Sequence, residues 1–428
     1  MTKDIIIPAL ARVEGEGALY IRTKDGAVDD IELNIYEPPR FFEGFLLGRY
    51  YQEVPDITAR ICGICPVAYQ MSGAQALEDA YGIEISDEVR ALRRLFYCAE
   101  YIESHTLHIY MLQAPDLLGQ DSVIGIAEIA PEAVKKALRL KKIGNDLLKA
   151  IGGRSVHPVN TKVGGVYRWP DVEKIKGLLD DMKWALQASL DTVQFAGSLD
   201  YPDFEMDYEF VSITRPDEYA IYDGDILSSS GKKVSVDEFE TAYLESHVPQ
   251  STALHSHTID GNAYFVGPLA RFNNNYEQLR PVAKKAAEEI GVQLPLKNPY
   301  KSLIARAVEL VEVCDVAVEL IESYDPKGEP FAEVQLKDSE GYGVSEAPRG
   351  TLYHRYKVGA DGLIKFAKIT PPTAQNYARM EADLWELAPN VISLPHKDAS
   401  LACEHLIRSY DPCISCSTHF LKLTIENA

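Results

Sequence analysis

Four of the seven cysteines lie in two Cys-x-x-Cys pairs, a spacing that could place their sulfur atoms on one metal centre. The first pair is Cys62 and Cys65, and the second is Cys413 and Cys416, near the other end of the 428-residue chain. Ionised thiolates are soft ligands that bind zinc, iron or nickel in preference to magnesium. The two pairs therefore predict a thiolate metal site.

Local sequence favours ionised thiols in both pairs. Pro66 suits the first position of a helix, which would make Cys65 the residue just before that helix. Asp411 and Pro412 suit a helix start with Cys413 in its first turn. Unpaired N–H groups and the dipole at a helix start stabilise a thiolate, so we expect the pKa of these thiols to lie below the free value of about 8.5.

A structural zinc site and a redox disulfide are the alternatives to a catalytic metal centre. Zinc ribbons keep their cysteine pairs about 15 to 20 residues apart, whereas these pairs lie near opposite ends of the chain. A chain of this length buries enough core to fold without such a staple. Acidic and histidine neighbours of both pairs favour metal binding over a redox disulfide. The other cysteines, Cys98, Cys314 and Cys403, stand singly in apolar stretches, and we expect them in the core.

The composition is that of an ordinary globular protein, with 46% hydrophobic and 25% charged residues, and excludes disordered, collagen-like and disulfide-rich classes. Sixty-four acidic and 43 basic residues give a net charge of −21, which opposes binding to nucleic acid or anionic lipid. No run reaches the roughly 18 apolar residues of a transmembrane helix, and the first residues do not resemble a signal peptide. We therefore expect a cytoplasmic protein without direct membrane insertion.

The elements that would position the cysteines are mainly helices. Apolar residues recur at helical spacing over residues 87–113, which predicts a long central helix. Two short helices should flank the first cysteine pair within residues 56–82. Further helices are expected over residues 131–151, 171–195, 276–324, 374–385 and 400–409.

Two β-hairpins are expected beside these helices. Asp25-Gly26 is a strong two-residue turn signal, and the hairpin that it predicts would bring Gly17 near Ile35. A second hairpin, turning at residues 359–362, would bring Arg349 close to Thr373. Because no linker interrupts the chain, we expect one interlocked domain over residues 1–428. Its predicted fold class is mainly α with α+β additions, a long-helix bundle core with peripheral β-hairpins.

Two motifs around the cysteines resemble the nickel-binding signatures of nickel-iron hydrogenase large subunits. They are residues 60–65 (RICGIC) and residues 411–419 (DPCISCSTH). Five further motifs follow the order of that family, at residues 12–15 (RVEG), 40–44 (RFFEG), 104–108 (SHTLH), 346–350 (EAPRG) and 372–376 (PTAQN). The resemblance therefore spans residues 12–419. It implies the fold of that family and reversible heterolytic cleavage of dihydrogen.

The resemblance also implies a role for each cysteine. Cys62 and Cys413 would be terminal thiolates on nickel, and Cys65 and Cys416 would bridge nickel to an iron that carries carbon monoxide and cyanide. Glu14, beside Cys413, would take part in the proton relay. The alternative for Glu14 is an ordinary surface carboxylate, since a relay requires a partner within about 3.2 Å.

Around the metals, the resemblance implies three contacts to the iron-bound ligands. Arg349 and Thr373 would hydrogen-bond the cyanides, with Pro348 beside them, and a surface arginine is the alternative for Arg349. Asp411 would serve as a helix cap, as an anion near Arg349, or as both. Glu43 and His419 resemble ligands of a separate magnesium ion or second iron. His105 and His108, which share one helix face, have an equal alternative as buried core histidines.

Three departures from the family pattern stand out. Tyr69 replaces a histidine four residues after Cys65, which changes or removes a hydrogen bond to a bridging sulfur. Ser104 replaces an aspartate that many relatives carry, which removes a negative charge near the cluster. Residues 420–428 follow His419, where family members are usually cut after metal insertion, so we interpret them as a maturation tail that requires a chaperone and a C-terminal protease.

Electrons from dihydrogen need an exit, and the remaining single cysteines cannot hold an iron-sulfur cluster. The resemblance therefore implies a small subunit with iron-sulfur clusters, and flavin-containing diaphorase subunits that pass electrons to a nicotinamide or deazaflavin acceptor. Chain length, residues 12–17 and Tyr69 look most like the soluble bidirectional branch, NAD(P)-linked or sulfhydrogenase. The alternatives are a zinc-stapled structural subunit and a non-catalytic relative of the quinone-site subunit of complex I, which lacks the four cysteines.

Overall fold

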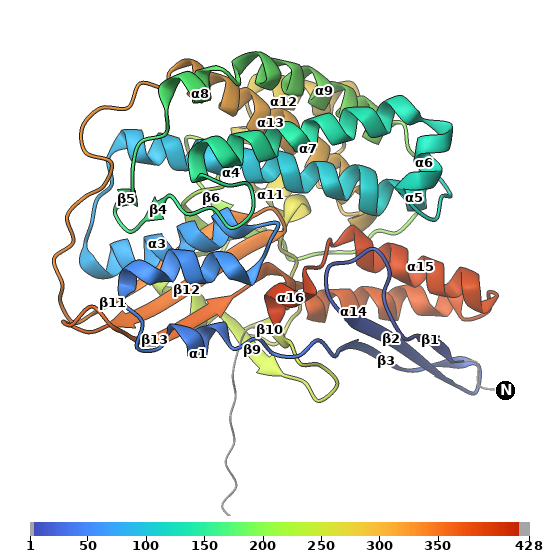
Figure 1. Ribbon diagram of the computed structural model, residues 1–428. Coiled ribbons are helices and arrows are strands. Elements are labelled where there is room, and N and C mark those ends of the chain that lie inside the picture. The colour runs from blue at the N-terminus through green and yellow to red at the C-terminus, as the bar shows by residue number, and fades with distance from the viewer. Residues whose placement is uncertain (1–3, 419–428) are drawn as a thin grey trace, which may run out of the picture.

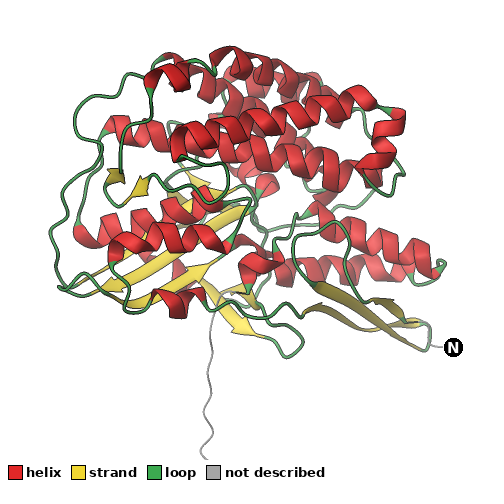
Figure 2. Cartoon of the chain, in the orientation of Figure 1, coloured by secondary structure: helices red, strands yellow, loops and turns green. Residues whose placement is uncertain are grey.

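The computed structural model describes residues 4–418, and its helices outnumber its strands (Figure 2). Long helices gather on one side of the molecule, and the strands lie with further helices on the other (Figure 1). This arrangement confirms the predicted class of a mainly helical core with β-hairpin additions. Within residues 4–418, we find no helix with the length and apolar character needed to cross a membrane.

The structure contains sixteen α-helices and thirteen strands within the described residues. The helices are α1 (Phe42–Leu46), α2 (Val54–Thr58), α3 (Pro66–Tyr81), α4 (Asp87–Leu107), α5 (Ala114–Leu117), α6 (Val123–Ile129), α7 (Pro131–Gly152), α8 (Val172–Lys176), α9 (Leu179–Gly197), α10 (Phe239–Ala242), α11 (Pro268–Asn275), α12 (Pro281–Glu289), α13 (Ser302–Glu322), α14 (Pro372–Val391), α15 (His396–Ser409) and α16 (Ile414–Ser417). The strands are β1 (Ile5–Ile7), β2 (Gly17–Lys24), β3 (Ala27–Ile35), β4 (Thr161–Lys162), β5 (Gly165–Val166), β6 (Val211–Thr214), β7 (Asp225–Ser228), β8 (Lys233–Val234), β9 (Tyr243–His247), β10 (Leu254–Thr258), β11 (Ser339–Ala347), β12 (Gly350–Val358) and β13 (Ile364–Thr370).

The long-helix bundle is built from α4, α7, α9 and α13 (Figure 1). Helix α4 packs against α7 and α13, and α13 packs against α9. Gly144 of α7 allows a close approach, because a Cβ atom there would lie 2.9 Å from the backbone oxygen of Ala99 in α4. Ser86 caps α4, accepting a hydrogen bond from the Val89 amide at 3.3 Å. The bundle thus supplies the rigid side of the molecule.

Both predicted hairpins are present. Strands β1, β2 and β3 form an antiparallel sheet in which Gly17 lies opposite Ile35, close to it as the turn at Asp25-Gly26 predicts, with a register shift between Arg22 and Thr23. Strands β12 and β13 form the second hairpin, and β11 pairs with the other edge of β12. The turn between β11 and β12 holds Pro348 and Arg349, and α14 begins directly after β13, with Thr373 in its first turn.

The expected elements differ from the structure in three places. Residues 276–324 form α12 and α13 rather than one helix, because Gly291 adopts a left-handed conformation (φ 72°) after α12 and Pro295 follows. The stretch 171–195 is divided into α8 and α9. The helix predicted at residues 87–113 continues past α4 as a short π-helix.

Candidate metal centre

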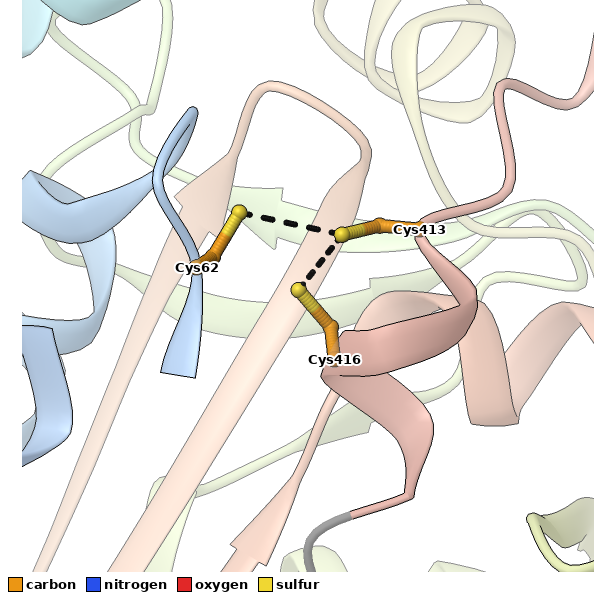
Figure 3. A group of neighbouring side chains, drawn as sticks. All are labelled: Cys62, Cys413 and Cys416. Atoms are coloured by element: carbon orange, nitrogen blue, oxygen red, sulfur yellow. Dashed lines mark hydrogen bonds between the residues drawn. The ribbon is translucent and has the colours of Figure 1, made fainter. Parts of the chain in front are cut away.

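The two Cys-x-x-Cys pairs meet between α3 and α16. Cys65 precedes Pro66, the first residue of α3, as predicted, and Cys62 lies in the turn before it. Two sulfur-sulfur distances join the pairs, 3.7 Å from Cys62 to Cys413 and 4.0 Å from Cys65 to Cys416, and the sulfurs within the second pair lie 2.7 Å apart. Figure 3 shows the Cys62, Cys413 and Cys416 side chains converging from the two chain segments.

The sulfur arrangement fits a soft metal. Each of the four cysteines is at most 5% exposed. A tetrahedral ion with metal-sulfur bonds of about 2.3 Å holds its sulfurs about 3.8 Å apart. The distances of 3.7 Å and 4.0 Å between the pairs match that spacing, and the sulfurs of Cys62, Cys413 and Cys416 lie within 4.8 Å of one another. The cluster therefore has the ligands of a thiolate metal centre, and the contacts between the two pairs have its dimensions, whereas Cys413 and Cys416 lie closer than that spacing, at 2.7 Å.

The predicted acidity of the thiols is correct only for Cys62. Hydrogen bonding from the Cys413 thiol stabilises the Cys62 thiolate and lowers its pKa well below the ordinary value. Burial raises the pKa of Cys413 and of Cys416. The pKa of Cys65 is also raised: its hydrogen bond to Cys413 lowers it, but its hydrogen bonds to Cys416 and Cys62, together with burial, outweigh that contact.

The two helix starts also differ from the prediction. Helix α16 begins at Ile414, so Cys413 is its cap rather than a first-turn residue, and Asp411 is a left-handed residue (φ 57°) instead of the cap. At α3, the buried Glu100 carboxylate accepts hydrogen bonds from the amides of Val67 and Ala68, at 2.6 and 3.2 Å. Glu100 thereby occupies the helix start that Cys65 was expected to use.

Glu14 reaches Cys413 directly. Its Oε2 atom accepts hydrogen bonds from the Cys413 sulfur and from the Ser415 amide, both at 3.1 Å. The backbones also pair, since the Ile414 amide donates to the Glu14 carbonyl at 2.8 Å and Glu14 forms a parallel bridge with Cys413. Glu14 is partly buried. Its carboxylate therefore lies within proton-transfer reach of a cluster sulfur.

An ion network holds the Glu14 segment against the C-terminal segment. The buried Asp116 carboxylate forms two hydrogen bonds with Arg408, at 2.7 and 2.8 Å, and a third with Arg12. Arg408 also donates to the carbonyl of Ala11 at 2.9 Å. Arg12 lies two residues before Glu14, so this network fixes the segment that carries the Glu14 carboxylate.

Arg349 and Thr373 converge on residues 411–413. Arg349 Nε donates to the Asp411 carbonyl at 2.9 Å, and its Nη2 pairs with the Asp411 carboxylate at 3.1 Å. The Cys413 amide donates to the Thr373 hydroxyl at 3.0 Å. Arg349 is 2% exposed, and its Nη1 has no hydrogen-bond partner among residues 4–418. Pro348 lies beside Arg349, and its carbonyl accepts from Arg271 at 3.0 Å.

The predicted second metal site is only partly described. Glu43 lies on α1, and its Oε1 atom accepts a hydrogen bond from the Ile369 amide at 2.8 Å. His419 lies outside the described residues, as does the tail at 420–428. The pairing of Glu43 with His419 therefore stays a prediction.

The two histidines of α4 and its π-helical extension are buried and hydrogen-bonded. His105 Nε2 contacts Glu309 at 2.7 Å, and His108 Nε2 contacts the Arg408 carbonyl at 2.8 Å. Burial lowers the pKa of His105 to about 4 and that of His108 to about 3, so both are neutral near pH 7. These contacts favour the core alternative over a ligand role.

The substituted positions Tyr69 and Ser104 are both buried, and neither side-chain oxygen has a hydrogen-bond partner in the described part of the chain. Burial, reinforced by the cluster thiolates, raises the pKa of Tyr69. A residue that the sequence did not single out, Arg306 of α13, lies near Asp411, with 3.9 Å between guanidinium and carboxylate. No sequence pattern indicated Arg306 or Glu100, because each is a charged residue within an otherwise helical stretch.

Comparison with known proteins agrees with this geometry. The family profile described as nickel-dependent hydrogenase matches residues 40–137 and 205–419. Sulfhydrogenase 1 subunit alpha of Pyrococcus furiosus is 33% identical, with 98% of each chain covered. NAD-reducing hydrogenase HoxS subunit beta of Cupriavidus necator is 28% identical, covering 98% of this chain and 96% of that protein. The solved structure of an NAD+-reducing nickel-iron hydrogenase in the H2-reduced state matches with a TM-score of 0.88 and 26% identity, over 97% of this chain and 99% of that one.

These similarities extend over nearly the whole chain and include both cysteine motifs. They confirm the predicted resemblance and its fold, and they favour neither the zinc-stapled nor the complex I-like alternative. The chain belongs to the nickel-dependent hydrogenase family.

Proposed function

We propose that the chain is the catalytic subunit in which dihydrogen is cleaved reversibly at a nickel-iron pair held by Cys62, Cys65, Cys413 and Cys416. The observation that carries this proposal is the convergence of four buried sulfurs from opposite ends of the chain, with a carboxylate 3.1 Å from one of them. A structural zinc site would need the four thiolates but not the relay carboxylate or the buried arginine beside them.

Within this proposal, the four cysteines bind the two metals in different ways. Cys62 and Cys413 would bind nickel, and Cys65 and Cys416 would bind both nickel and iron. When bound, the nickel-iron group would supply the electrophilic metal pair that cleaves dihydrogen heterolytically, so that each molecule yields two protons and two electrons. Soft thiolates suit both metals. The single domain that we infer over residues 1–428 is consistent with one hydrophobic core that includes both Ile5 and Cys416.

The proton would leave through Cys413 and Glu14. The sulfur of Cys413 accepts a proton and passes it to Glu14 Oε2, which already accepts a hydrogen bond from that sulfur at 3.1 Å. The Ser415 amide holds the same oxygen in place. A general base at this distance needs no rearrangement to accept a proton.

Arg349 would be the principal charged donor toward the iron-bound carbon monoxide and cyanide ligands. Its ion pair with Asp411 fixes the guanidinium plane, and its Nη1 remains available for a ligand. The Thr373 hydroxyl and the backbone beside Pro348 would complete this environment. Asp411 acts by orienting Arg349, which is the anionic role rather than the capping role.

Beyond the cluster, Glu43 and His419 would bind a magnesium ion or second iron, and residues 420–428 would be removed by a C-terminal protease after a chaperone delivers metal. A small subunit with iron-sulfur clusters would take the electrons, and flavin-containing subunits would pass them to a nicotinamide-type acceptor. The relatives named as a sulfhydrogenase alpha subunit and as an NAD-reducing hydrogenase subunit support this assignment. The complex would be cytoplasmic and NAD(P)-linked.

An infrared spectrum of the anaerobically purified protein, combined with nickel and iron analysis, tests the proposal. We expect carbon monoxide and cyanide stretching bands, which ordinary proteins lack, together with both metals. A protein that contains zinc and shows no such bands would refute the nickel-iron assignment. The Cys416→Ser variant is the matched control, because it should lose the bands without losing the fold.

A further inference from the structure

We propose that Arg271, held by an ion pair with Glu309, is a positioning residue that orients Arg349 toward the metal centre. This inference rests on the proposed role of Arg349. Within residues 4–418, the guanidinium of Arg271 hydrogen-bonds to Glu309, Glu346, Ala347 and Pro348 and to no cysteine, so it acts through the backbone beside Arg349. Its segment, α11, lies between the helical bundle and the sheet (Figure 1).

The contacts of Arg271 are concentrated on the residues just before Arg349. One guanidinium nitrogen, Nη1, donates to the Ala347 carbonyl and to the Glu346 carboxylate, both at 2.9 Å. The other, Nη2, donates to the Pro348 carbonyl at 3.0 Å. Three consecutive residues of the turn are therefore bound by one planar side chain that is fully buried.

The turn itself has a backbone that needs such support. Gly350 has φ 134°, a conformation that favours glycine, and a Cβ atom there would lie 2.9 Å from the Gly267 amide. In the other direction, a Cβ atom on Gly267 would lie 2.9 Å from the Arg349 carbonyl oxygen. The start of α11 thus packs directly on the backbone of Arg349, four residues before Arg271 itself.

Glu309 of α13 holds Arg271 in this orientation. Its two carboxylate oxygens pair with Arg271 Nε and Nη2, at 2.7 and 2.9 Å. Tyr219 and His105 occupy the same oxygens, at 2.6 and 2.7 Å. Burial alone would raise the pKa of Glu309, but Arg271 lowers it to about 2, so the pair is fully ionised near pH 7.

The same helix also holds the partner of Arg349. One turn before Glu309, Arg306 lies near Asp411 and donates to the Ser409 carbonyl at 3.3 Å, and Ser302 donates to that carbonyl at 2.7 Å. Helix α13 therefore contacts two segments of the site. Through Glu309 and Arg271 it holds the turn with Arg349, and through Arg306 it holds the segment with Asp411. A single helix, α13, thus sets the separation between Arg349 and Asp411.

A purely structural role is the alternative, and the chain offers a matched control for it. Arg93 is also fully buried, pairs with both oxygens of Glu78 at 2.7 and 2.9 Å, and donates to two backbone carbonyls. Those carbonyls belong to Lys162 and Gly165 rather than to the Arg349 turn. Replacing either arginine by lysine removes the same kind of bidentate contact, so both variants should lose similar stability.

The experiment compares Arg271→Lys with Arg93→Lys and Arg349→Lys in the full chain. Amide hydrogen exchange of the chain before metal loading is measured for peptides covering residues 346–351, and dihydrogen turnover is measured in the assembled complex, normalised to metal content. We expect faster exchange in that turn and a turnover loss of about 10²-fold for Arg271→Lys, since a displacement of about 1 Å costs that much in oriented catalysis. Arg93→Lys should change neither.

If Arg271→Lys does not fold, Glu309→Gln, compared with Glu78→Gln, is the second pair, because each change removes the charge and one acceptor oxygen of the carboxylate while keeping its shape. The proposal is wrong if the folded variant shows the same amide hydrogen exchange at residues 346–351 and the same dihydrogen turnover as its control. If Arg349→Lys loses dihydrogen turnover but Arg271→Lys keeps it, the positioning role of Arg271 is wrong and the proposed function stands. Full turnover of Arg349→Lys would overturn the positioning role together with the role of Arg349.

Discussion

Replacing Glu14 by glutamine isolates the proton relay from the rest of the site. The amide oxygen of glutamine can still accept the hydrogen bond from the Ser415 amide, which the carboxylate accepts at 3.1 Å. The backbone bridge between Glu14 and Cys413 does not involve the side chain and is retained. What glutamine cannot do is take a proton from the Cys413 sulfur and release it. The change therefore removes a base and preserves the geometry.

The expected loss follows from the chemistry of that single contact. A positioned general base contributes typically about 10²- to 10⁴-fold to the rate. At 1.36 kcal/mol per factor of ten, this corresponds to a barrier higher by about 3 to 5 kcal/mol. We expect the Glu14→Gln variant to fall within that range, because the 3.1 Å separation already places the carboxylate within direct reach of the sulfur.

The assay is dihydrogen-dependent reduction of an artificial electron acceptor by the purified complex, with nickel and iron measured on the same sample. Glu37→Gln is the control, since Glu37 is a neighbouring carboxylate whose side chain accepts a hydrogen bond from the Glu16 amide at 3.0 Å instead of one from a cluster sulfur. Glu37→Gln should turn over like the parent. A Glu14→Gln enzyme that has full metal content and parental turnover would show that the proton leaves by another route.

Three further predictions concern metal retention, stability and pH. Cys65→Ser should lose nickel and iron by elemental analysis, whereas Cys403→Ser, a buried cysteine outside the cluster, should keep both. Asp116→Asn should lower the free energy of unfolding by about 3 to 5 kcal/mol, because it removes the nearer carboxylate from buried Arg408 and leaves it only Glu404 at 3.6 Å; an unchanged denaturation midpoint would contradict this. Burial raises the pKa of Glu312 from 4.5 to about 7, so the folded state holds a proton that the unfolded state releases, and this contribution to stability is lost as the pH rises from 4.5 to 7. Glu312→Gln should flatten the fall in unfolding free energy over that pH range, and an unaltered slope would count against the protonated carboxyl.

Much of the fold is readable from local sequence. The turn at Asp25-Gly26 predicted that Gly17 and Ile35 would lie near each other, but not their direct pairing, because a bulge between Arg22 and Thr23 shifts the register by one residue from Asn34 to Ile35. Strand β11 was not predicted, since its glycines weaken the strand signal. Gly341 is required there by tertiary packing: a Cβ atom at that position would lie 2.1 Å from a backbone oxygen of α3.

Site residues could be predicted from sequence where they belong to a motif. They could not be predicted where their role depends on being buried beside the site in the folded chain. The cysteine pairs, Glu14 and Arg349 stand in recognisable motifs, and the structure brings them together. The acidity of Cys65 was mispredicted because, although Cys413 lowers its pKa, the sulfurs of Cys416 and Cys62 and burial together raise it, and local sequence does not show these contacts. Arg306 was missed for the same reason, since hydrophobic periodicity cannot indicate which charged residue of a helix will be buried beside a site.

The separation of the two cysteine pairs has a consequence for the order of folding. Cys62 and Cys413 are 351 residues apart, yet their sulfurs lie 3.7 Å from each other. Closing so long a loop adds little free energy, about 0.6 kcal/mol for each doubling of its length, but it is among the slowest contacts to form. In a chain synthesised from its N-terminus, the first pair can fold with α3 long before the second pair exists. The complete four-sulfur site is therefore a late event, and a ribosome that stops before residue 413 leaves a chain with only half of the ligands.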